Sequence, residues 1–340
     1  MGIRFSLAAV VALVLAVFLG VKSAGLGHFF GTTVPYIAIF AFMIGFLYKV
    51  LKWASSPVPF RIPTTAGQEK SLPWIKRNKF DNPSNNKETV VRMLLEVLLF
   101  RSLFRNTKTE LAKGPKIYYQ WEKWLWLAGL AFHYSFLVIL LRHLRFFTDS
   151  VPFFVHALDN ADGFLQVGLP GIYISDMVFI IAVTYLLIRR VVIPQMRYIS
   201  LPADYFPLFL LLGIGVTGIL MRYFIRVDLL KVKQLALGIV TFHPVVPDGI
   251  GVIFFIHFFL VCTLFAYFPF SKLMHAGGVF LSPSRNLPND SRIKRHINPW
   301  NYPVKVHTYA EYEDHFREKM VEAGLPVEKE LPADATTGKN

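Results

Sequence analysis

Cysteine is almost absent from this sequence, which contains a single one, Cys262, in 340 residues. One thiol cannot form an internal disulfide, the C-x-x-C-H attachment site of c-type haem, or the thiolate set that holds an iron–sulfur cluster. The chain also lacks an internal repeat, a glycine-rich phosphate loop and a low-complexity tract. Any haem bound to this chain must therefore be held noncovalently, by side chains other than cysteine.

Acidic side chains are also scarce, since 22 Asp and Glu stand against 36 Lys and Arg. That balance could indicate nucleic-acid binding, but 54% of the residues are apolar and the mean hydropathy is +0.44. A membrane-spanning helix needs about 20 apolar residues. The sequence therefore predicts an all-α integral membrane protein with six transmembrane helices near Phe5 to Val21, Val34 to Leu51, Trp124 to Leu141, Tyr173 to Ile188, Ala203 to Met221 and Ile250 to Phe270.

The positive charges are concentrated in alternate loops, which predicts the orientation. Residues 48–120 contain fourteen Lys and Arg against five Asp and Glu, and residues 272–308 contain six against one. Basic loops stay in the cytoplasm, so we expect a chain in the cytoplasmic membrane with both termini inside. The loop at residues 222–249, with four basic and two acidic residues, is an exception on the outer side.

The first apolar segment has two interpretations. Residues 1–20 have a basic start and an apolar run, as a secretory signal peptide does, but Val21-Lys22-Ser23-Ala24 is a poor cleavage site. We expect a retained helix. Cleavage would leave the orientation of the later helices unchanged.

Four histidines lie inside or at the ends of two apolar segments, His133 and His143 on one, His257 and His275 on the other. Burying imidazole in lipid is costly, so such a residue usually has a partner or a function. For any one of them, a satisfied core histidine is as good an explanation as a metal ligand. Antiparallel helices would pair His133 with His275 and His143 with His257, which predicts two bis-histidine haem b sites stacked across the membrane.

Helix geometry supports this pairing in part. The histidines are ten and eighteen residues apart, which corresponds to rises of about 15 and 27 Å, and their mean is a sensible separation for two haems in one bilayer. Ten residues also turn the helix face by roughly 80°, so His133 and His143 must approach their irons from different flanks.

Three motifs surround the last two histidines: Thr241-Phe-His-Pro, Asp248-Gly-Ile-Gly-Val-Ile-Phe-Phe-Ile-His257 and Phe268-Pro-Phe-Ser-Lys-Leu-Met-His275. They resemble the last helix of the nitrate reductase gamma family of quinol-oxidising cytochromes b, and the resemblance extends over roughly residues 34–278. That family's four haem ligands have the same spacings and match the four histidines. The resemblance implies that the last five helices form a dihaem bundle, with His133 and His275 on the inner haem b and His143 and His257 on the outer one.

Other features are closer to a second group of cytochromes. The extra first helix, the basic loop with its segments 53–68 and 71–76, and the tail motif Asn298-Pro-Trp-Asn301 are similar to the DsrM family of the sulfite-reductase-associated DsrMKJOP membrane complex. This resemblance, which we prefer, implies menaquinol or menaquinone as the substrate and a role in anaerobic sulfur respiration. It also implies a cytoplasmic iron–sulfur subunit related to heterodisulfide reductase, with further membrane and periplasmic subunits. The alternative is a gamma subunit of a nitrate reductase or of another heterodisulfide-reductase-like complex.

Polar residues near the expected outer haem are secondary candidates. Three arginines could pair with haem propionates or could be interfacial anchors: Arg142, Arg145 and Arg222. Three residues of the outer loop could accept quinol protons or could simply be solvated: His156, Asp159 and Asp162. Asp176 could belong to a proton path or merely begin a helix.

We divide the chain into an extra helix with a short outer loop (residues 1–33), a dihaem domain (34–276, with a cytoplasmic basic loop at 52–120) and a cytoplasmic tail (277–340). Glu88 to Arg105 is expected to be an amphipathic helix on the membrane surface. The tail turns acidic and helical from Glu311 to Glu322. We expect the basic loop and the tail to dock the iron–sulfur subunit.

Two hypotheses of another class remain, a proton-coupled transporter and a haemless membrane anchor. A transporter would more often show inverted repeats and helices broken at matching positions, and the sequence contains neither. The expected role is therefore electron transfer within a quinol-oxidising oxidoreductase complex.

Overall fold

The computed structural model describes residues 2–56, 78–111, 114, 116–163, 171–289 and 305–329. The chain forms two compact units, one of residues 1–56 and 61–295, the other of residues 57–60 and 296–340. In the first unit, all six predicted spans form long helices: α1 (Gly2–Lys22), α2 (Val34–Ala54), α5 (Lys123–His143), α7 (Ile174–Val192), α9 (Pro202–Ile219) and α11 (Val252–Tyr267). Five of these, all except α7, are long and apolar enough to cross a membrane, as the helices of a membrane protein are.

Helix α7 differs from the other five because it carries three charges. Asp176 lies in its first turn, and Arg189 and Arg190 lie in its last. Arg142 lies 2.7 Å from Asp176, and Arg189 lies 2.7 Å from Glu122 of the segment before α5. Arg190 in turn lies 3.9 Å from Asp204 of α9, so the charges of α7 are confined to its ends and all three have partners of opposite charge.

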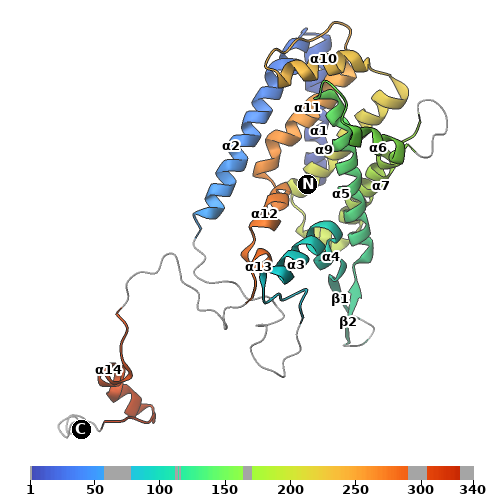
Figure 1. Ribbon diagram of the computed structural model, residues 1–340. Helices are drawn as coiled ribbons and strands as arrows, with labels where there is room; N and C mark the ends of the chain where they lie inside the picture. The colour runs from blue at the N-terminus through green and yellow to red at the C-terminus, as the bar shows by residue number, and fades with distance from the viewer. Residues whose placement is uncertain are drawn as a thin grey trace. The chain divides into compact units, whose positions relative to one another are not determined.

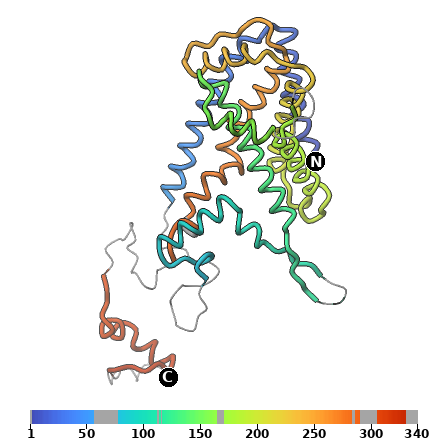
Figure 2. Tube along the Cα trace, turned by 45° about the vertical axis from the view of Figure 1, so that its right-hand side comes forward, coloured from blue at the N-terminus to red at the C-terminus, as the bar shows by residue number. Residues whose placement is uncertain are grey.

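The long helices pack in a continuous series. Helix α5 packs against α7, α7 against α9, α9 against α1 and α11, and α11 against α1 and α2 (Figures 1 and 2). Helices α7 and α9 approach closely at Gly215, where an added Cβ would lie 2.7 Å from Ile180 and 2.8 Å from Phe179. Fully buried aliphatic side chains fill the bundle: Val17, Val183, Leu210 and Leu260.

Shorter elements cover the two ends of the bundle. Helix α10 (Leu229–Val240) crosses one end, which also holds α6 (Phe153–Asp162), and we call this the α10 end (Figure 1). The opposite end, which we call the α3 end, holds α3 (Asn86–Leu99) and α4 (Arg101–Phe104). The remaining short elements are η1 (Phe29–Thr33), η2 (Leu144–Phe146), α8 (Pro194–Ile199), η3 (Leu220–Phe224), η4 (Phe268–Phe270), η5 (Lys272–Met274), α12 (His275–Leu281) and α13 (Pro283–Asn286).

The prediction of an all-α chain is wrong in one place. Strands β1 (Thr107–Leu111) and β2 (Ile117–Trp121) form an antiparallel hairpin at the α3 end. Threonine, isoleucine and aromatic residues, which favour strands, alternate there with polar ones. Gly114 in the connecting turn has a φ of +93°, a conformation that other residues rarely adopt.

The predicted amphipathic helix between Glu88 and Arg105 forms as α3 and α4, separated by a break at Phe100, which has a φ of 49°. The side chain of Asn85 caps α3 by accepting a hydrogen bond from the backbone N–H of Glu88. The charged residues Arg92 and Glu96 are buried, whereas the apolar residues of the opposite face are exposed: Val90, Val91, Leu94, Leu98 and Leu99. This polarity suits a helix that rests on lipid better than one surrounded by water.

The last long helix is broken before it reaches His275. Helix α11 ends at Tyr267, Ser271 is extended with φ −118° and ψ 177°, and α12 begins at His275. Pro269 contributes to the break because it has no backbone N–H to continue the helix. The rise of 27 Å expected between His257 and His275 therefore does not describe one unbroken helix.

In the second unit, α14 (Tyr309–Glu322) begins with a capping box between Thr308 and Glu311. The buried carboxylate of Glu313 accepts hydrogen bonds from the backbone N–H groups of Glu328 and Lys329, at 2.8 and 2.9 Å. This carboxylate therefore holds the segment after α14 against the helix.

Acid should release this segment. The N–H of Glu328, followed by that of Lys329 and by Arg317, lowers the pKa of Glu313. A carboxyl group whose pKa is lowered by folding stabilises the fold fully when the pH is above its pKa in the unfolded chain, about 4.3. This stabilisation is lost as the pH falls through its pKa in the folded chain. We expect Glu313→Gln to speed amide hydrogen exchange at residues 328–329 at pH 7. In the unaltered chain, acid should have the same effect once the exchange rates are corrected for the intrinsic dependence on pH. Equal exchange in Glu313→Gln and in the exposed control Glu318→Gln would contradict this assignment.

Candidate functional site

The structure brings His133 of α5 and His275 at the start of α12 together. Their ring centroids are 5.9 Å apart, and the ring planes are inclined by 82°. If one metal ion were bonded to a nitrogen of each ring, each bond would be about 2 Å long. Together with the distance from each nitrogen to its ring centroid, the two bonds give roughly the observed centroid separation. Phe100 and Phe132 pack edge-on against His133, with centroids 4.9 and 4.8 Å away.

The other two histidines also lie near one another. His143 is the last residue of α5 and His257 lies within α11, and the two side chains are near enough to influence one another's charge. Each predicted pair is thus brought together from different helices. The role of these four residues as haem ligands stays a prediction.

All four imidazoles direct Nδ1 toward a backbone carbonyl oxygen. Three of these carbonyls precede the histidine by three or four residues: Gly129 at 2.7 Å from His133, Ile139 at 2.6 Å from His143, and Lys272 at 2.8 Å from His275. A carbonyl can only accept, so Nδ1 carries the proton and Nε2 keeps a free lone pair. This is the tautomer that a metal-ligating histidine needs when its other nitrogen is held by the protein.

His257 is held by a neighbouring helix and not by its own. Its Nδ1 lies 3.1 Å from the carbonyl oxygen of Ile214 and 2.9 Å from the hydroxyl of Thr217, both on α9. That hydroxyl lies 2.7 Å from the carbonyl oxygen of Gly213, to which it donates, so its lone pair is available to the imidazole N–H. Gly218 also lies beside the ring, since an added Cβ there would be in van der Waals contact with Cε1 of His257, at 3.4 Å. Helix α9 therefore fixes both the position and the tautomer of this ring.

The donor set suits haem iron, which takes imidazole nitrogen as an axial ligand. Within the described ranges, no group of three or more His, Cys, Asp or Glu side chains could hold a bare metal ion. Paired imidazoles with free Nε2 atoms match an iron whose other four positions are filled by a porphyrin. The residues present therefore fit haem b.

A buried ionic cluster lies beside His143. Arg142, whose side chain is 7% exposed, lies 2.7 Å from Asp176 and 3.1 Å from Asp162. The hydroxyl of Tyr223 donates to Asp176 at 2.9 Å, and the backbone N–H and hydroxyl of Ser175 donate to Asp162 at 2.7 and 2.6 Å. These bonds join α5, α6, α7 and η3. The cluster thereby anchors the end of α5 that carries His143.

The three arginines predicted for propionates have the following surroundings. Arg142 is paired with the two aspartates above, and Arg145 is paired with Asp159. The guanidinium carbons of Arg142 and Arg222 lie 3.7 and 3.9 Å from the ring centroid of Tyr173. The structure thus gives all three arginines neighbours within the protein.

The three predicted quinol-pocket residues all lie on α6. Asp162 and Asp159 take part in the ion pairs above, whereas His156 is exposed. Part of the same loop, residues 164–170, lies outside the described residues. Their role in quinol chemistry therefore stays a prediction.

Sequence reasoning missed two groups of residues. The first is the set around His257: Gly213, Ile214, Thr217 and Gly218. The second is a charged group in a cleft beside His275, where Arg189, Arg190, Lys272 and Asp204 lie among apolar side chains of α5, α7 and α9. Lys272 stands three residues before a predicted ligand, which is a signal that sequence alone contained. The Thr217 contact had no such signal, because it joins residues 40 positions apart.

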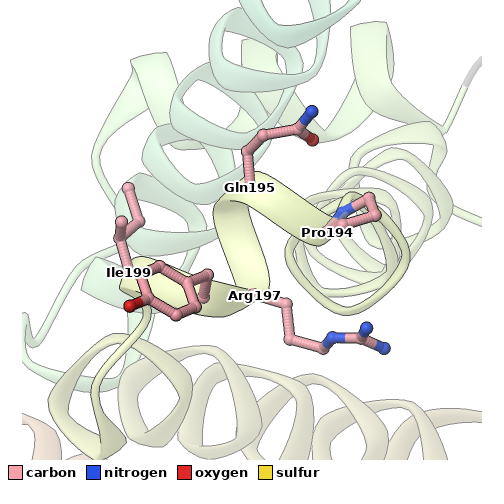
Figure 3. Close-up of a pocket in the computed structure, with 5 residues that line it drawn as sticks. Pro194, Gln195, Arg197 and Ile199 are labelled. Carbon is pink, nitrogen blue, oxygen red and sulfur yellow. The ribbon is translucent and has the colours of Figure 1, made fainter.

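A second hollow is not part of this site. It is lined by Pro194, Gln195, Arg197, Tyr198 and Ile199 (Figure 3). All five belong to the short helix α8, and none of the four histidines lines the hollow.

Comparisons with known proteins identify relatives of the chain. Residues 95–289 match the family model described as nitrate reductase gamma subunit. An Archaeoglobus fulgidus protein called Hdr-like menaquinol oxidoreductase cytochrome b-like subunit is 49% identical over 283 residues, which cover 81% of this chain and 84% of the relative. A protein of the same name from Archaeoglobus profundus is 46% identical over 274 residues, 78% of this chain and 81% of the relative.

The hydroxyl of Thr217 should tune a metal held by His257. A hydrogen bond to the imidazole N–H makes the ring a stronger donor and favours the oxidised metal. We expect Thr217→Val to raise the midpoint potential of one haem and to weaken its retention by about tenfold, with the second haem unchanged in a redox titration. Thr217→Ser should behave as the unaltered chain.

Thr263→Val is a matched control, because the Thr263 hydroxyl also lies in a bundle helix but donates to the carbonyl oxygen of Phe259, at 2.8 Å. Identical titrations of Thr217→Val and Thr263→Val would refute the role of Thr217.

Proposed function

Because the chain belongs to the nitrate reductase gamma family of membrane cytochromes b, we propose that it is the dihaem subunit of a menaquinol oxidoreductase complex. The observation that carries the proposal is the shared state of the four histidines, each with Nδ1 at a backbone carbonyl oxygen and with no hydrogen-bond partner of Nε2 among the described residues. A haemless anchor or a transporter would not need this arrangement four times in two pairs.

Each pair would hold one haem b, His133 with His275 near the α3 end and His143 with His257 near the α10 end. Bound haem supplies reversible one-electron transfer. The backbone carbonyls and Thr217 keep each imidazole in the ligating tautomer. Arg189, Arg190 and Lys272 line the cleft beside His275 together with Asp204, so a propionate bound there would share these cations with Glu122 and Asp204. Arg142, Arg145 and Arg222 are the corresponding candidates near His143.

We propose that all six long helices span the cytoplasmic membrane, with α7 as the sixth span. The neutralised charges at the ends of α7 support this assignment, because paired charges near a helix end are much less costly than isolated ones at the membrane centre. The basic residues of the loop at 52–120 support a cytoplasmic α3 end. Both termini are then cytoplasmic.

Menaquinol or menaquinone is the proposed substrate at the α10 end. The names of both relatives support it. Asp159, Asp162 and His156 are the candidate proton acceptors there, since they are titratable residues of one helix beside His143. Release of quinol protons at this end and delivery of electrons to the other would separate charge across the membrane.

The proposed electron partner is a cytoplasmic iron–sulfur subunit related to heterodisulfide reductase. The chain carries no iron–sulfur ligands of its own, because it has one cysteine. The relatives' designation as Hdr-like supports a partner of this kind. The resemblance of the loop and tail motifs to the DsrM family supports a role in anaerobic sulfite or sulfate respiration.

Haem stoichiometry tests the pairing. A pyridine haemochrome assay should give two haems b per chain, one after His143→Ala or His257→Ala, and one after His133→Ala or His275→Ala. The double variant His143→Ala/His257→Ala should retain one haem, whereas His133→Ala/His143→Ala should retain none. His243→Ala is the control, because His243 is exposed and should leave both haems in place. A ratio near zero in the assembled unaltered complex would refute the proposal.

Removal of the tail tests the docking role of the second unit. The chain is best truncated after residue 304. An earlier truncation at Ser282 would also remove Asn289, which bonds to Pro83 and Asn82 before α3, at 2.7 and 2.6 Å. We expect reoxidation of the haems by the iron–sulfur partner to slow about tenfold, as loss of one moderate interface contact would produce. The visible spectrum should not change. Reoxidation at the full rate would assign docking to the loop at 52–120 alone.

A further inference from the structure

The hairpin of β1 and β2 has one apolar and one polar face. Leu111 pairs with Ile117, Thr109 with Tyr119, and Thr107 with Trp121. Side chains alternate along a strand, so these six residues share one face. The other face carries Lys108, Glu110, Tyr118 and Gln120, where Tyr118 donates to Glu110 at 2.7 Å. The hairpin is thus amphipathic, and at its base the ammonium of Lys123 lies 4.1 Å from the ring centroid of Trp121.

The apolar face is open to the surroundings. The exposed fractions are 77% for Leu111, 62% for Ile117, 70% for Tyr119 and 63% for Trp121. An isolated two-stranded hairpin is marginally stable in water, and a contiguous apolar patch normally marks an interaction site. Something must therefore cover this face in the assembled protein.

The base of the hairpin is fixed to the bundle. The backbone N–H of Glu122 donates to the carbonyl oxygen of Asn106 at 3.3 Å, and the carboxylate of Glu122 lies 2.7 Å from Arg189 of α7. Trp126 of α5 donates to the carbonyl oxygen of Leu99 at 2.7 Å, which ties α3 to the same place. The hairpin is consequently presented in one orientation.

The position of the hairpin excludes lipid as the cover for its tip. Both views show it continuing beyond the first residues of α5, away from the bundle (Figures 1 and 2). The 21 residues of α5 rise about 32 Å, which fills the hydrocarbon thickness of a bilayer. The five residues of each strand add roughly 16 Å beyond that boundary. Trp121 at the base suits the interface, but Leu111 and Ile117 at the tip lie in water unless a protein covers them.

We propose that the apolar face of this hairpin is the docking surface for the iron–sulfur subunit, an inference that rests on the proposed function. The hairpin leads directly into α5, on which His133 follows ten residues after Lys123, so a subunit seated there lies at the end of the bundle where electrons leave. Lys116 and Lys123 flank the apolar face, whereas Glu110 is paired with Lys108 and Glu122 with Arg189. The partner surface is therefore apolar with an acidic rim.

The test compares the two faces of the hairpin in the full complex. Leu111→Thr/Ile117→Thr removes apolar surface at the tip and retains residues that favour strands. Lys108→Thr/Gln120→Thr is the matched control, a directly paired position on the other face. The ratio of iron–sulfur subunit to haem after purification from membranes should fall by about tenfold or more in the first variant and stay unchanged in the control.

Crosslinking gives a second measurement that does not depend on weakened binding. The single native cysteine, Cys262, is buried. A short thiol-reactive crosslinker should therefore join the Ile117→Cys variant to the iron–sulfur subunit. It should not join the Gln120→Cys variant, whose thiol lies on the other face of the hairpin.

The outcomes separate this proposal from the proposed function. Equal retention of the subunit in both hairpin variants, with crosslinking from neither site or from both alike, overturns the docking surface. Haem content measured in the same samples should be two per chain throughout. Absence of haem from the unaltered complex would overturn the proposed function, whereas unchanged haem with unchanged retention overturns the hairpin alone.

Discussion

The constraint on which the rest of the structure depends is that polar groups inside an apolar bundle must find partners within the protein. The four imidazoles meet it at Nδ1 with backbone carbonyls. Because the carbonyls of Gly129, Ile139 and Lys272 belong to the histidine's own helix or turn, three of the rings are oriented almost entirely by local structure. The fourth, His257, depends on tertiary packing, since its partners lie on α9. The two proposed haem sites thus differ in what holds them.

The same constraint explains the arrangement of charge. Asp176, Arg189 and Asp204 lie near the ends of bundle helices, and each has a partner of opposite charge on another element. Such pairs fix how far one helix can slide along its neighbour. Glycine at position 215 lets α9 approach α7 closely, because an added Cβ would lie less than 3 Å from Ile180 and Phe179. Packing and polar pairing therefore determine the site together.

Much of the fold could be predicted from the sequence, because a run of about 20 apolar residues has few alternatives to a helix in lipid. The six helices are of this kind, and their antiparallel order also accounts for the proximity of the His133 and His275 rings. The hairpin was missed because its ten strand residues lie in a basic loop, where amphipathic alternation is short and weak. The break at Ser271 was missed because the motif from Phe268 to His275 was treated as helix despite Pro269. The cluster of Arg142 with Asp162 and Asp176 could not be found, because its members come from three helices and no spacing rule connects them.

The break between α11 and α12 has a mechanical consequence. A rigid rod that carried both His257 and His275 would transmit any push at one end to the other. The extended backbone at Ser271 interrupts the rod, so η5 and α12 can shift without turning the ring of His257. Strain imposed at the α3 end is then absorbed within a few residues, and the two histidine pairs keep independent geometries.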